Sequence, residues 1–437
     1  MGILKSYCAD CIIIKKEDDV YMNIIKYLSK ITALVLTLTM LTGLLAGCAS
    51  PGGKMRNMST MEIVKDMGLG INLGNTFEST GSWINSSSVT NYETGWGSPV
   101  ITEDIIKGYA KEGFTTLRVP VAWSNMMSGD YDINPDYLAR VKQVIDWALD
   151  SDMYVIMNIH WDGGWWEKFS GKDKDECMHK YERIWTQLTK EFKSYGDKLI
   201  FESLNEEGCW DDIWNRYSGK TEGKAEAFGL LNEINQKFVD IVRASGGNNK
   251  KRHLLIAGYG TDIALTCDEL YKMPDDPAGR CAVSVHYYTP STFAILEKDA
   301  SWGKCRKEWG TDADIKELET NMDMMKKNFV DKGIPVIIGE YGCPVKNKEK
   351  ESIRKYLTSV CRAAYDRDMC PVLWDVTDAF YSRSKCEFKD KELLKRLMAV
   401  KSGSSDKTVT TGKKTKTDKS SKTSAGKSNT SNKSKKK

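Results

Sequence analysis

The sequence predicts one (β/α)8 barrel domain, and three observations support this fold class. The chain has 437 residues, of which 41% are hydrophobic, and this is enough to build one large core. Between residues 59 and 400, short β-rich runs alternate with amphipathic stretches of about ten to twenty residues, as in βαβ units. No Gly-x-Gly-x-x-Gly turn follows the first run, which argues against an open dinucleotide-binding sheet.

Eight runs are expected to form the strands: 69–75, 115–119, 154–160, 199–205, 253–257, 282–287, 335–341 and 371–376. Helices are expected near residues 102–112, 135–150, 176–194, 225–245, 265–272, 313–332, 349–367 and 389–399. Asn134 followed by Pro135 predicts the start of the second helix, because asparagine caps a helix and proline fits its first position. Gly113 and Gly333 predict helix ends, because glycine readily adopts the left-handed conformation that closes a helix.

The N-terminal segment, residues 1–48, is interpreted as an extension followed by a bacterial lipoprotein signal. Lys26 and Lys30 precede an apolar run over residues 31–45, which leads to the sequence Leu-Ala-Gly-Cys ending at Cys48. This pattern resembles the signals whose cysteine is lipidated, so we expect a protein anchored by lipid at Cys48 on the bacterial cell surface. A transmembrane helix is the alternative, but about 16 apolar residues fall short of the roughly 20 that span a bilayer.

The remaining terminal segments have simple compositions. Translation can start at Met1 or at Met22, which lies directly before the signal. Residues 49–58 read as a linker, and residues 401–437 consist almost entirely of Lys, Ser, Thr, Gly and Asn. Such a composition buries too little apolar surface to fold, so we expect a disordered tail. A role as a wall-binding or electrostatic tether and a solvated tail without a partner are both open.

The charge of the chain is unevenly distributed. Residues 401–437 carry 12 Lys and two Asp, a charge of +10, so the rest of the chain accounts for −6 of the overall +4. No Lys/Arg stripe interleaved with aromatic residues falls within the periodic segments, so we expect no nucleic-acid partner. Nine of the 12 cysteines follow Cys48, without a Cys-x-x-Cys pair or a His spacing that fits a zinc site. We read them as mostly buried thiols and leave disulfides open.

Polar and aromatic side chains gather at the ends of the predicted strands, where barrel enzymes carry their catalytic groups. These residues are Asn72, Asn75, Arg118, His160, Asn205, Glu206, His286, Tyr288, Glu340 and Trp374. Glu206 and Glu340 follow the fourth and seventh strands, which lie nearly opposite each other across the mouth of a barrel. Two carboxylates at about 5 Å are what glycoside cleavage with retention requires. A structural ion pair with Arg118 is the alternative for either carboxylate alone, and each histidine can equally be a core residue.

The two carboxylates are expected to titrate differently. A guanidinium beside a carboxylate lowers its pKa, so Arg118 is expected to keep Glu340 ionised as a nucleophile. Repulsion by Glu340 is expected to raise the pKa of Glu206, which then serves as a general acid.

Several of these motifs together resemble glycoside hydrolase family 5, the cellulase family. The resemblance covers most of residues 60–400 and rests on Gly-Ile-Asn-Leu-Gly-Asn at 70–75, Leu-Arg-Val-Pro-Val at 117–121, Asn-Ile-His at 158–160, Ser-Leu-Asn-Glu at 203–206, His-Tyr-Tyr at 286–288 and Gly-Glu-Tyr-Gly at 339–342. It implies that Glu206 is the acid/base, that Glu340 is the nucleophile, and that Asn205 binds the sugar 2-hydroxyl. It also implies that Arg118 and Tyr288 orient Glu340, that His160 and His286 line the reacting subsite, and that Trp374 stacks on the sugar.

Aromatic residues in the predicted loops point to a sugar cleft, because a flat ring packs against the C–H face of a pyranose. Trp161, together with Asn75, is expected to contact the substrate; the other candidates are Trp83, Trp96, Trp165, Trp166, Trp210 and Trp302. Glu207 stands where the family often has proline. The bulky loop that begins at Trp161 can narrow or extend the cleft, so the preferred glucan stays open.

The resulting expectation is a monomeric, lipid-anchored hydrolase that cleaves β-1,4-glucan internally with retention and uses no cofactor or metal. Cellulose, mixed-linkage glucan and xyloglucan all fit as substrates, and β-mannan is the alternative within the same chemistry. A lipid-anchored glycan-binding protein without catalysis is a second alternative, but it would not need both Glu206 and Glu340. A transglycosylase would use the same residues.

Overall fold

A computed structural model describes residues 53–208 and 210–403 of the chain. The predicted signal segment with Cys48, the alternative starts at Met1 and Met22, and the tail beyond residue 403 lie outside the described residues. Within them, none of the helices combines the length and the apolar character that a membrane span requires.

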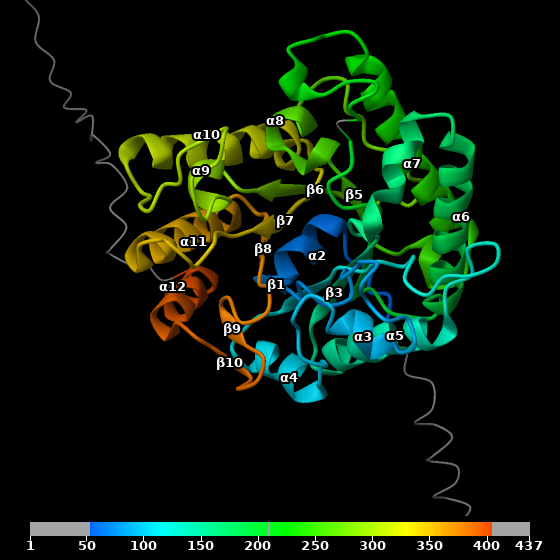
Figure 1. The fold of residues 1–437 in the computed structure, drawn as a ribbon, viewed down its shortest axis with the longest axis horizontal. Coiled ribbons are helices and arrows are strands. Elements are labelled where there is room, and N and C mark those ends of the chain that lie inside the picture. The colour runs from blue at the N-terminus through cyan, green and yellow to red at the C-terminus, as the bar shows by residue number, and fades with distance from the viewer. Residues whose placement is uncertain (1–52, 209, 404–437) are drawn as a thin grey trace, which may run out of the picture.

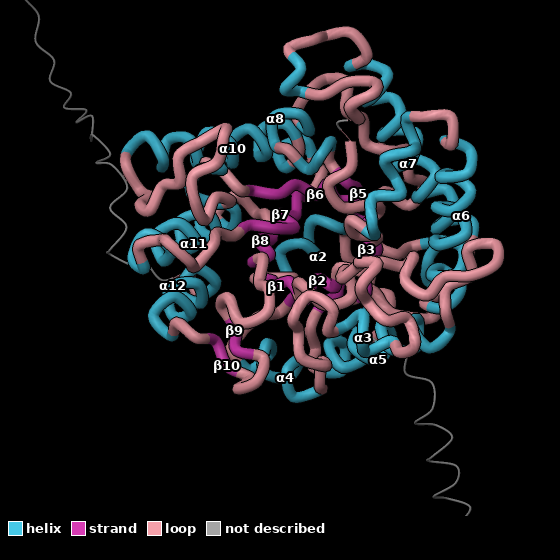
Figure 2. Tube along the Cα trace, in the orientation of Figure 1, coloured by secondary structure: helices cyan, strands magenta, loops and turns pink. Residues whose placement is uncertain are grey.

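Eight parallel strands close into a barrel, in which each strand pairs with its neighbours in the sequence and β8 pairs with β1. The strands are β1 Gly70–Asn72, β2 Thr116–Val119, β3 Tyr154–Asn158, β4 Leu199–Glu202, β5 Leu254–Ala257, β6 Cys281–Tyr287, β7 Val336–Tyr341 and β8 Cys370–Leu373. Figures 1 and 2 show this ring of strands surrounded by helices. The predicted fold class and all eight strands are therefore confirmed.

The main helices are α4 Glu103–Lys111, α5 Pro135–Asp150, α6 Lys174–Glu191, α7 Lys224–Ala244, α10 Asp312–Asn328, α11 Lys350–Tyr365 and α12 Lys391–Lys401. The predicted helix over 265–272 is wrong: α8 covers only Ile263–Thr266, and the Asp268 carboxylate accepts from the Leu270 amide in a turn. The structure adds α2 Thr60–Asp66, α3 Val89–Glu93, α9 Ser291–Ala294 and a hairpin of β9 Tyr381–Ser382 and β10 Glu387–Phe388.

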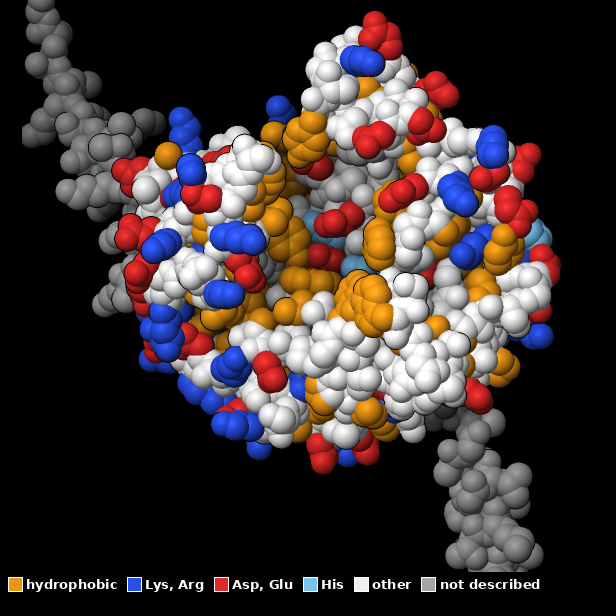
Figure 3. Space-filling model, viewed as in Figure 1, with side chains coloured by type: hydrophobic (Ala, Val, Ile, Leu, Met, Phe, Trp, Pro, Cys, Tyr) orange, Lys and Arg blue, Asp and Glu red, His pale blue; other side chains and the backbone are white. Residues whose placement is uncertain are grey.

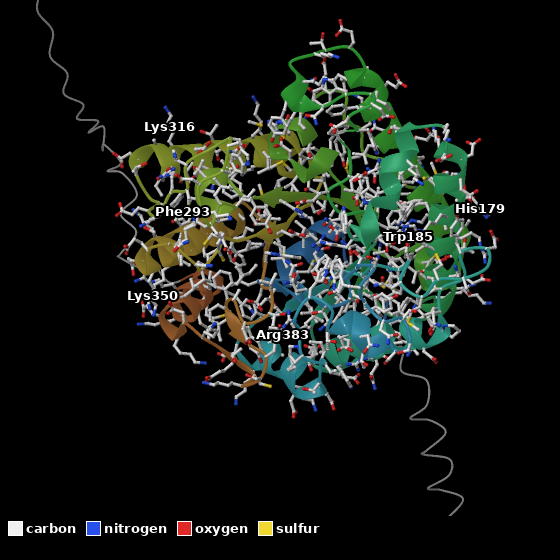
Figure 4. All side chains as sticks on the ribbon, viewed as in Figure 1. His179, Trp185, Phe293, Lys316, Lys350 and Arg383 are labelled. Carbon is white, nitrogen blue, oxygen red and sulfur yellow. The ribbon has the colours of Figure 1, made fainter. Side chains whose placement is uncertain are left out.

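The core has two parts, one between the helices and the barrel and one inside the barrel. Trp185 of α6 is fully buried against Phe201 and Phe238, whereas His179 of the same helix points outward, to a hydrogen bond with Asp130 (Figure 4). The cysteines in the described residues are all free thiols, and half of them are buried: Cys177, Cys343, Cys361 and Cys370.

Helix α2 closes the amino-terminal end of the barrel. Ile63, Val64 and Met67 are buried against the apolar side chains inside the barrel, and α2 is visible in the centre of the ring in Figure 1. The Thr60 hydroxyl lies 2.9 Å from Nδ1 of His253, which directly precedes β5. The carboxyl-terminal end of the barrel is thereby left as the open end.

Acid is expected to destabilise the fold through His253. Arg280 can only donate, and it lies 3.2 Å from Nε2 of His253, so Nε2 accepts and a second proton has no place there. Burial, followed by the charge of Arg280, lowers the pKa of His253 to about 3. Its neutral form therefore contributes stability above about pH 6.5, the ordinary pKa of histidine, and this contribution is lost as the pH falls toward 3.

At pH 5 the loss from His253 alone is expected to be about 2 kcal/mol of unfolding free energy. Urea unfolding of the wild type and of His253→Gln at pH 8 and pH 5 measures it, because glutamine does not titrate. An equal pH dependence in both proteins would contradict the assignment.

Candidate active site

Glu340 lies in β7 at the open end of the barrel and is 5% exposed. Its Oε1 accepts a hydrogen bond from Nη1 of Arg118 at 2.8 Å, and its Oε2 accepts from the hydroxyl of Tyr288 at 2.8 Å. Burial and the charge of Glu340 raise the pKa of Tyr288 well above its ordinary value, so the phenol stays protonated and donates. One carboxylate oxygen thus faces a guanidinium and the other a phenol.

Arg118 connects four strands inside the barrel. Besides Glu340, it donates through Nε to Glu202 at 2.7 Å, through Nη1 to Asn72 at 3.1 Å and through Nη2 to Oδ1 of Asn205 at 2.9 Å. Arg118 and Glu202 are fully buried, so the guanidinium has two carboxylate partners rather than one. Because Oδ1 of Asn205 accepts this hydrogen bond, the amide nitrogen of Asn205 is the group left to donate to a ligand.

Glu202 belongs to this cluster but was not predicted from the sequence. A carboxylate in the otherwise apolar run Leu199-Ile200-Phe201-Glu202 is the signal that could have revealed it. Side chains alternate along a strand, so Glu202 lies on the same face as Ile200, which packs inside the barrel. A buried carboxylate on that face requires a cation, and Arg118 is that cation.

Glu206 follows β4, and its Oε1 lies 2.6 Å from Nδ1 of His286 in β6. His286 is 3.6 Å from Oε2 of Glu340, and one ligand atom from each of the three residues lies within 4.8 Å of the others. The carboxylates are therefore closer than the roughly 6.5–9.5 Å of inverting glycosidases and match the spacing of retaining ones. This trio can also be described as a set of metal-ligand atoms, but both oxygens of Glu340 already accept hydrogen bonds from protein donors.

The pKa values of the two carboxyls shift in the opposite directions to those expected from sequence. Burial raises the pKa of Glu340 above its ordinary value and outweighs the charges of His286 and Arg118. The Glu206 side chain is 49% exposed, and the hydrogen bond and the charge of His286 outweigh its partial desolvation, so its pKa is lowered. The expected directions rested on Arg118 and on the repulsion between the carboxyls, whereas the observed ones follow from the burial of Glu340 and from the contact of Glu206 with His286.

His160 and Trp374 form one wall of the site. Their rings are stacked, with centroids 5.8 Å apart and an interplanar angle of 5°. His160 is 7% exposed, and burial lowers its pKa well below the ordinary value, so it is neutral. Nδ1 of His160 lies 3.3 Å from the Asn158 amide, which fixes the plane of the ring against Trp374.

Asn75 and Trp161 lie outside the hydrogen-bonded cluster formed by the described residues around Glu340. The backbone N–H of Asn75 donates to Glu78, and Trp161 is 44% exposed in the loop that follows β3. Trp210, predicted as a cleft residue, is instead buried edge-to-face against Tyr259. Trp83 and Trp302 are exposed, at 72% and 58%.

Two cavities meet at Glu206. The first, of about 650 Å³, is lined by His160, Asn205, Glu340 and Trp374, and the second, of about 690 Å³, by Arg216, Tyr217, Thr261 and His286. Glu206, Tyr288 and Ile295 line both. Figure 3 shows this hollow at the centre of the open face, with acidic and histidine side chains at its floor and hydrophobic ones around it. The cleft therefore continues on both sides of the carboxylates.

The model of a known protein family, "Cellulase (glycosyl hydrolase family 5)", matches residues 77–380 of the chain. The chain belongs to glycosyl hydrolase family 5. An endoglucanase A of Paenibacillus barcinonensis is 34% identical over 350 residues, which cover 74% of this chain and 83% of that relative. A xyloglucan-specific endo-β-1,4-glucanase of Bacteroides ovatus is 30% identical over 347 residues, covering 76% and 68%. The solved structure of a broad-specificity endoglucanase from an uncultured bovine rumen ciliate matches with a TM-score of 0.72 and 36% identity, covering 79% and 99%.

The family 5 assignment agrees with the geometry of the site. The family is a retaining one, and the carboxylates lie at the spacing that retention requires. Eight predicted residues, from Arg118 to Trp374, line the cavities or contact the carboxylates, whereas Asn75 and Trp161 are not part of this cluster of described side chains.

Proposed function

We propose that this family 5 hydrolase is an endo-acting β-1,4-glucanase that works by double displacement, with Glu340 as nucleophile and Glu206 as acid/base. The observation that carries the proposal is the pair of carboxylates within 4.8 Å at the junction of the two cavities. Arg118 and Tyr288 hold Glu340 by two hydrogen bonds, and His286 holds Glu206. One carboxylate is thus fixed for attack and the other for proton transfer.

In the first step, a carboxylate oxygen of Glu340 attacks the anomeric carbon, and the glycosidic C–O bond breaks. Glu206 gives its proton to the leaving oxygen, and the sugar is left as an ester of Glu340. Glu206 must be protonated for this step although its contact with Nδ1 of His286 lowers its pKa, and the proton shared across that 2.6 Å contact is close enough to move onto Glu206. Arg118 and Tyr288 stabilise the negative charge of Glu340 until the bond forms.

In the second step, water attacks the anomeric carbon from the side of the departed sugar. Glu206, now ionised, accepts the proton of that water, the ester bond breaks, and Glu340 regains its charge. Two inversions give net retention. The charge repulsion between the carboxyls disappears while the ester exists, and this loss favours the ionised form of Glu206 at the moment it acts as a base.

The remaining residues are assigned to substrate binding. Trp374, held flat by its stack with His160, offers an apolar face to the sugar beside Glu340. The amide nitrogen of Asn205 is available for the sugar 2-hydroxyl, because Arg118 binds its oxygen. Asn75 and the exposed Trp161 are proposed to contact sugars farther from the cleavage point.

The continuation of the cleft on both sides of Glu206 supports internal cleavage, because sugar units can then lie on either side of the bond that breaks. The named relatives act on different glucans, one of them specifically on xyloglucan and another with broad specificity. We therefore propose unsubstituted β-1,4-glucan as the basic substrate, with mixed-linkage glucan and xyloglucan also accepted.

Reducing-sugar release from carboxymethyl cellulose, mixed-linkage glucan, xyloglucan and mannan tests this function. Release from the glucans, with a rapid fall in the viscosity of carboxymethyl cellulose, is expected. Release from mannan alone would replace glucan by mannan as substrate, and binding without release would identify a glycan-binding protein. Products longer than the oligosaccharides supplied would identify a transglycosylase.

Replacing Glu206 by glutamine is expected to affect substrates according to their leaving group. Unactivated glucan needs a general acid, so kcat/KM for it is expected to fall by about 10²–10⁴-fold. A dinitrophenyl β-cellobioside needs no proton on its leaving group and is expected to release dinitrophenol in a burst, followed by slow turnover that azide accelerates. Equal losses on both substrates would assign Glu206 a different role.

We also infer that the protein acts as a monomer anchored by lipid at Cys48 to the bacterial membrane. This inference is supported by the sequence Leu-Ala-Gly-Cys, which follows an apolar run that lysines precede. Metabolic labelling with a radioactive fatty acid is expected to label the wild type and not Cys48→Ser, and light scattering of the enzyme released by detergent measures its mass. Equal labelling of both proteins would refute the anchor.

A further inference from the structure

The two cavities that meet at Glu206 differ in the catalytic groups that line them. The first cavity, and not the second, is lined by Glu340, Asn205 and Trp374, which act on the sugar that is attacked. Glu206 lines both cavities, and in the proposed mechanism it protonates the oxygen of the sugar that leaves. The leaving part of the glucan is therefore expected in the second cavity.

The loop between β4 and α7 forms one wall of the second cavity. It contains two buried tryptophans, Trp210 and Trp214, whose rings pack against Tyr259 with centroids 6.5 and 6.0 Å away. Nε1 of Trp214 also donates to the carbonyl of Lys220 at 2.8 Å. Between these contacts the loop forms the short 3₁₀ helix Arg216–Ser218, which is exposed. The buried rings thus fix the position of an exposed loop tip.

The loop tip brings a charged and an aromatic side chain to the second cavity, Arg216 and Tyr217. Tyr217 is 87% exposed, and the guanidinium of Arg216 lies over its ring, 5.5 Å from the centroid. The same guanidinium donates to one carboxylate oxygen of Asp262, which lines the cavity too. The other oxygen of Asp262 accepts from the N–H of Leu265 at 2.9 Å, at the start of α8. The ion pair therefore connects the loop tip to the segment that follows β5.

This combination of groups suits a sugar. A flat ring packs against the C–H face of a pyranose, and a guanidinium and a carboxylate form hydrogen bonds with its hydroxyls. A single exposed aromatic side chain is ordinary on a protein surface. Tyr217, however, lines the same cavity as Glu206, and the cation–π contact with Arg216 restricts the orientation of its ring.

We propose that Tyr217 and the Arg216–Asp262 pair form a binding site for the glucosyl units on the leaving side of the bond that breaks. The proposal rests on the proposed function, because Glu206 must be the acid that faces the leaving sugar. The ring of Tyr217 packs against the C–H face of one unit, and Arg216 donates to its hydroxyls. Binding energy from this contact favours chains that extend past the cleavage point, which is what internal cleavage requires.

The test compares Tyr217→Ala, Tyr217→Phe and Arg216→Met on two substrates. Cellopentaose places sugar units on both sides of the cleaved bond. The leaving group of β-cellobiosyl fluoride is a fluoride ion, so this substrate puts no sugar into the second cavity and serves as the internal control. Because Arg216 and Tyr217 are exposed, all three variants are expected to fold. The measurement is kcat/KM on each substrate.

Tyr217→Ala is expected to lower kcat/KM on cellopentaose by about tenfold, and Arg216→Met by a similar factor, because a glucosyl unit loses a contact. Tyr217→Phe is expected to keep the wild-type value, because the ring makes the contact. All three variants are expected to cleave the fluoride at the wild-type rate. In Tyr217→Ala the cleaved bond of cellopentaose is also expected to move toward the reducing end, and mass spectrometry of products from substrate labelled there with heavy oxygen locates it.

Two results would overturn the proposal. An equal fall on both substrates would show that the loop has a merely structural role, and an unchanged kcat/KM of Tyr217→Ala on cellopentaose would show that no sugar contacts the ring. Failure of the proposed function has a different signature. In that case the wild type would cleave neither substrate, or Glu340→Gln would cleave both.

Discussion

Replacing Glu340 by glutamine is expected to lower kcat on every β-glucan by roughly 10⁴-fold or more. Glutamine keeps the shape of the side chain, but its amide is a poor nucleophile and cannot form the glycosyl ester. Its NH₂ group also faces either Arg118 or Tyr288, both of which are donors toward this side chain. Reducing-sugar release from carboxymethyl cellulose and dinitrophenol release from dinitrophenyl β-cellobioside are both expected to disappear, unlike the outcome for Glu206→Gln.

The matched control is Glu233→Gln. Glu233 lies on α7 and forms an exposed pair with Lys174 at 2.7 Å, which contributes little to stability. Its activity is expected to equal that of the wild type. Adding azide to Glu340→Gly should restore cleavage of the activated substrate and give a glycosyl azide of inverted configuration. Retained activity in a correctly folded Glu340→Gln would eliminate Glu340 as the nucleophile.

Replacing Arg118 by methionine is expected to reduce the free energy of unfolding by about 3–5 kcal/mol as well as to abolish activity. The loss of the guanidinium leaves Glu202 and Glu340 without their cation in the interior of the barrel. It also removes the N–H groups that donate to the side-chain oxygens of Asn72 and Asn205, so the site loses its order at four strand ends. Urea unfolding measures the stability change, and kcat/KM on mixed-linkage glucan measures the activity.

A second substitution separates stability from catalysis. In the Arg118→Met, Glu202→Gln double variant, one of the two uncompensated carboxylates is gone, and part of the stability is expected to return. Activity is not expected to return, because Glu340 still lacks its partner. A double variant as unstable as the sum of the two single variants would show that Arg118 and Glu202 do not interact in solution.

The sequence predicted the strands, and that the candidate site residues would lie together at one end of the barrel, because both depend on local patterns. Arg118, His160, Glu206, His286 and Glu340 each lie at or just beyond the end of a strand, and in a barrel all these ends meet at one face. Several predicted strands extended too far, as in 69–75 against the observed Gly70–Asn72, whereas the sixth begins one residue before its predicted start.

Features that depend on contacts between distant segments were not predictable in this way. The pKa directions of Glu206 and Glu340 follow from burial and from the place of His286, neither of which a motif contains. The helix predicted over 265–272 is wrong because the Asp268 side chain caps a turn there, and hydrophobic periodicity does not reveal such a cap.

The closure of the barrel by α2 fixes the direction in which this enzyme would face a surface. The described chain begins beside α2, and its last helix, α12, also ends at that pole, where Lys401 donates to the carbonyl of Gly113 ahead of β2. Both ends of the barrel thus leave from the side opposite Glu206 and Glu340. An enzyme tethered through either end would hold the open end of its barrel away from the membrane, toward polysaccharide fibres that are too large to diffuse to it.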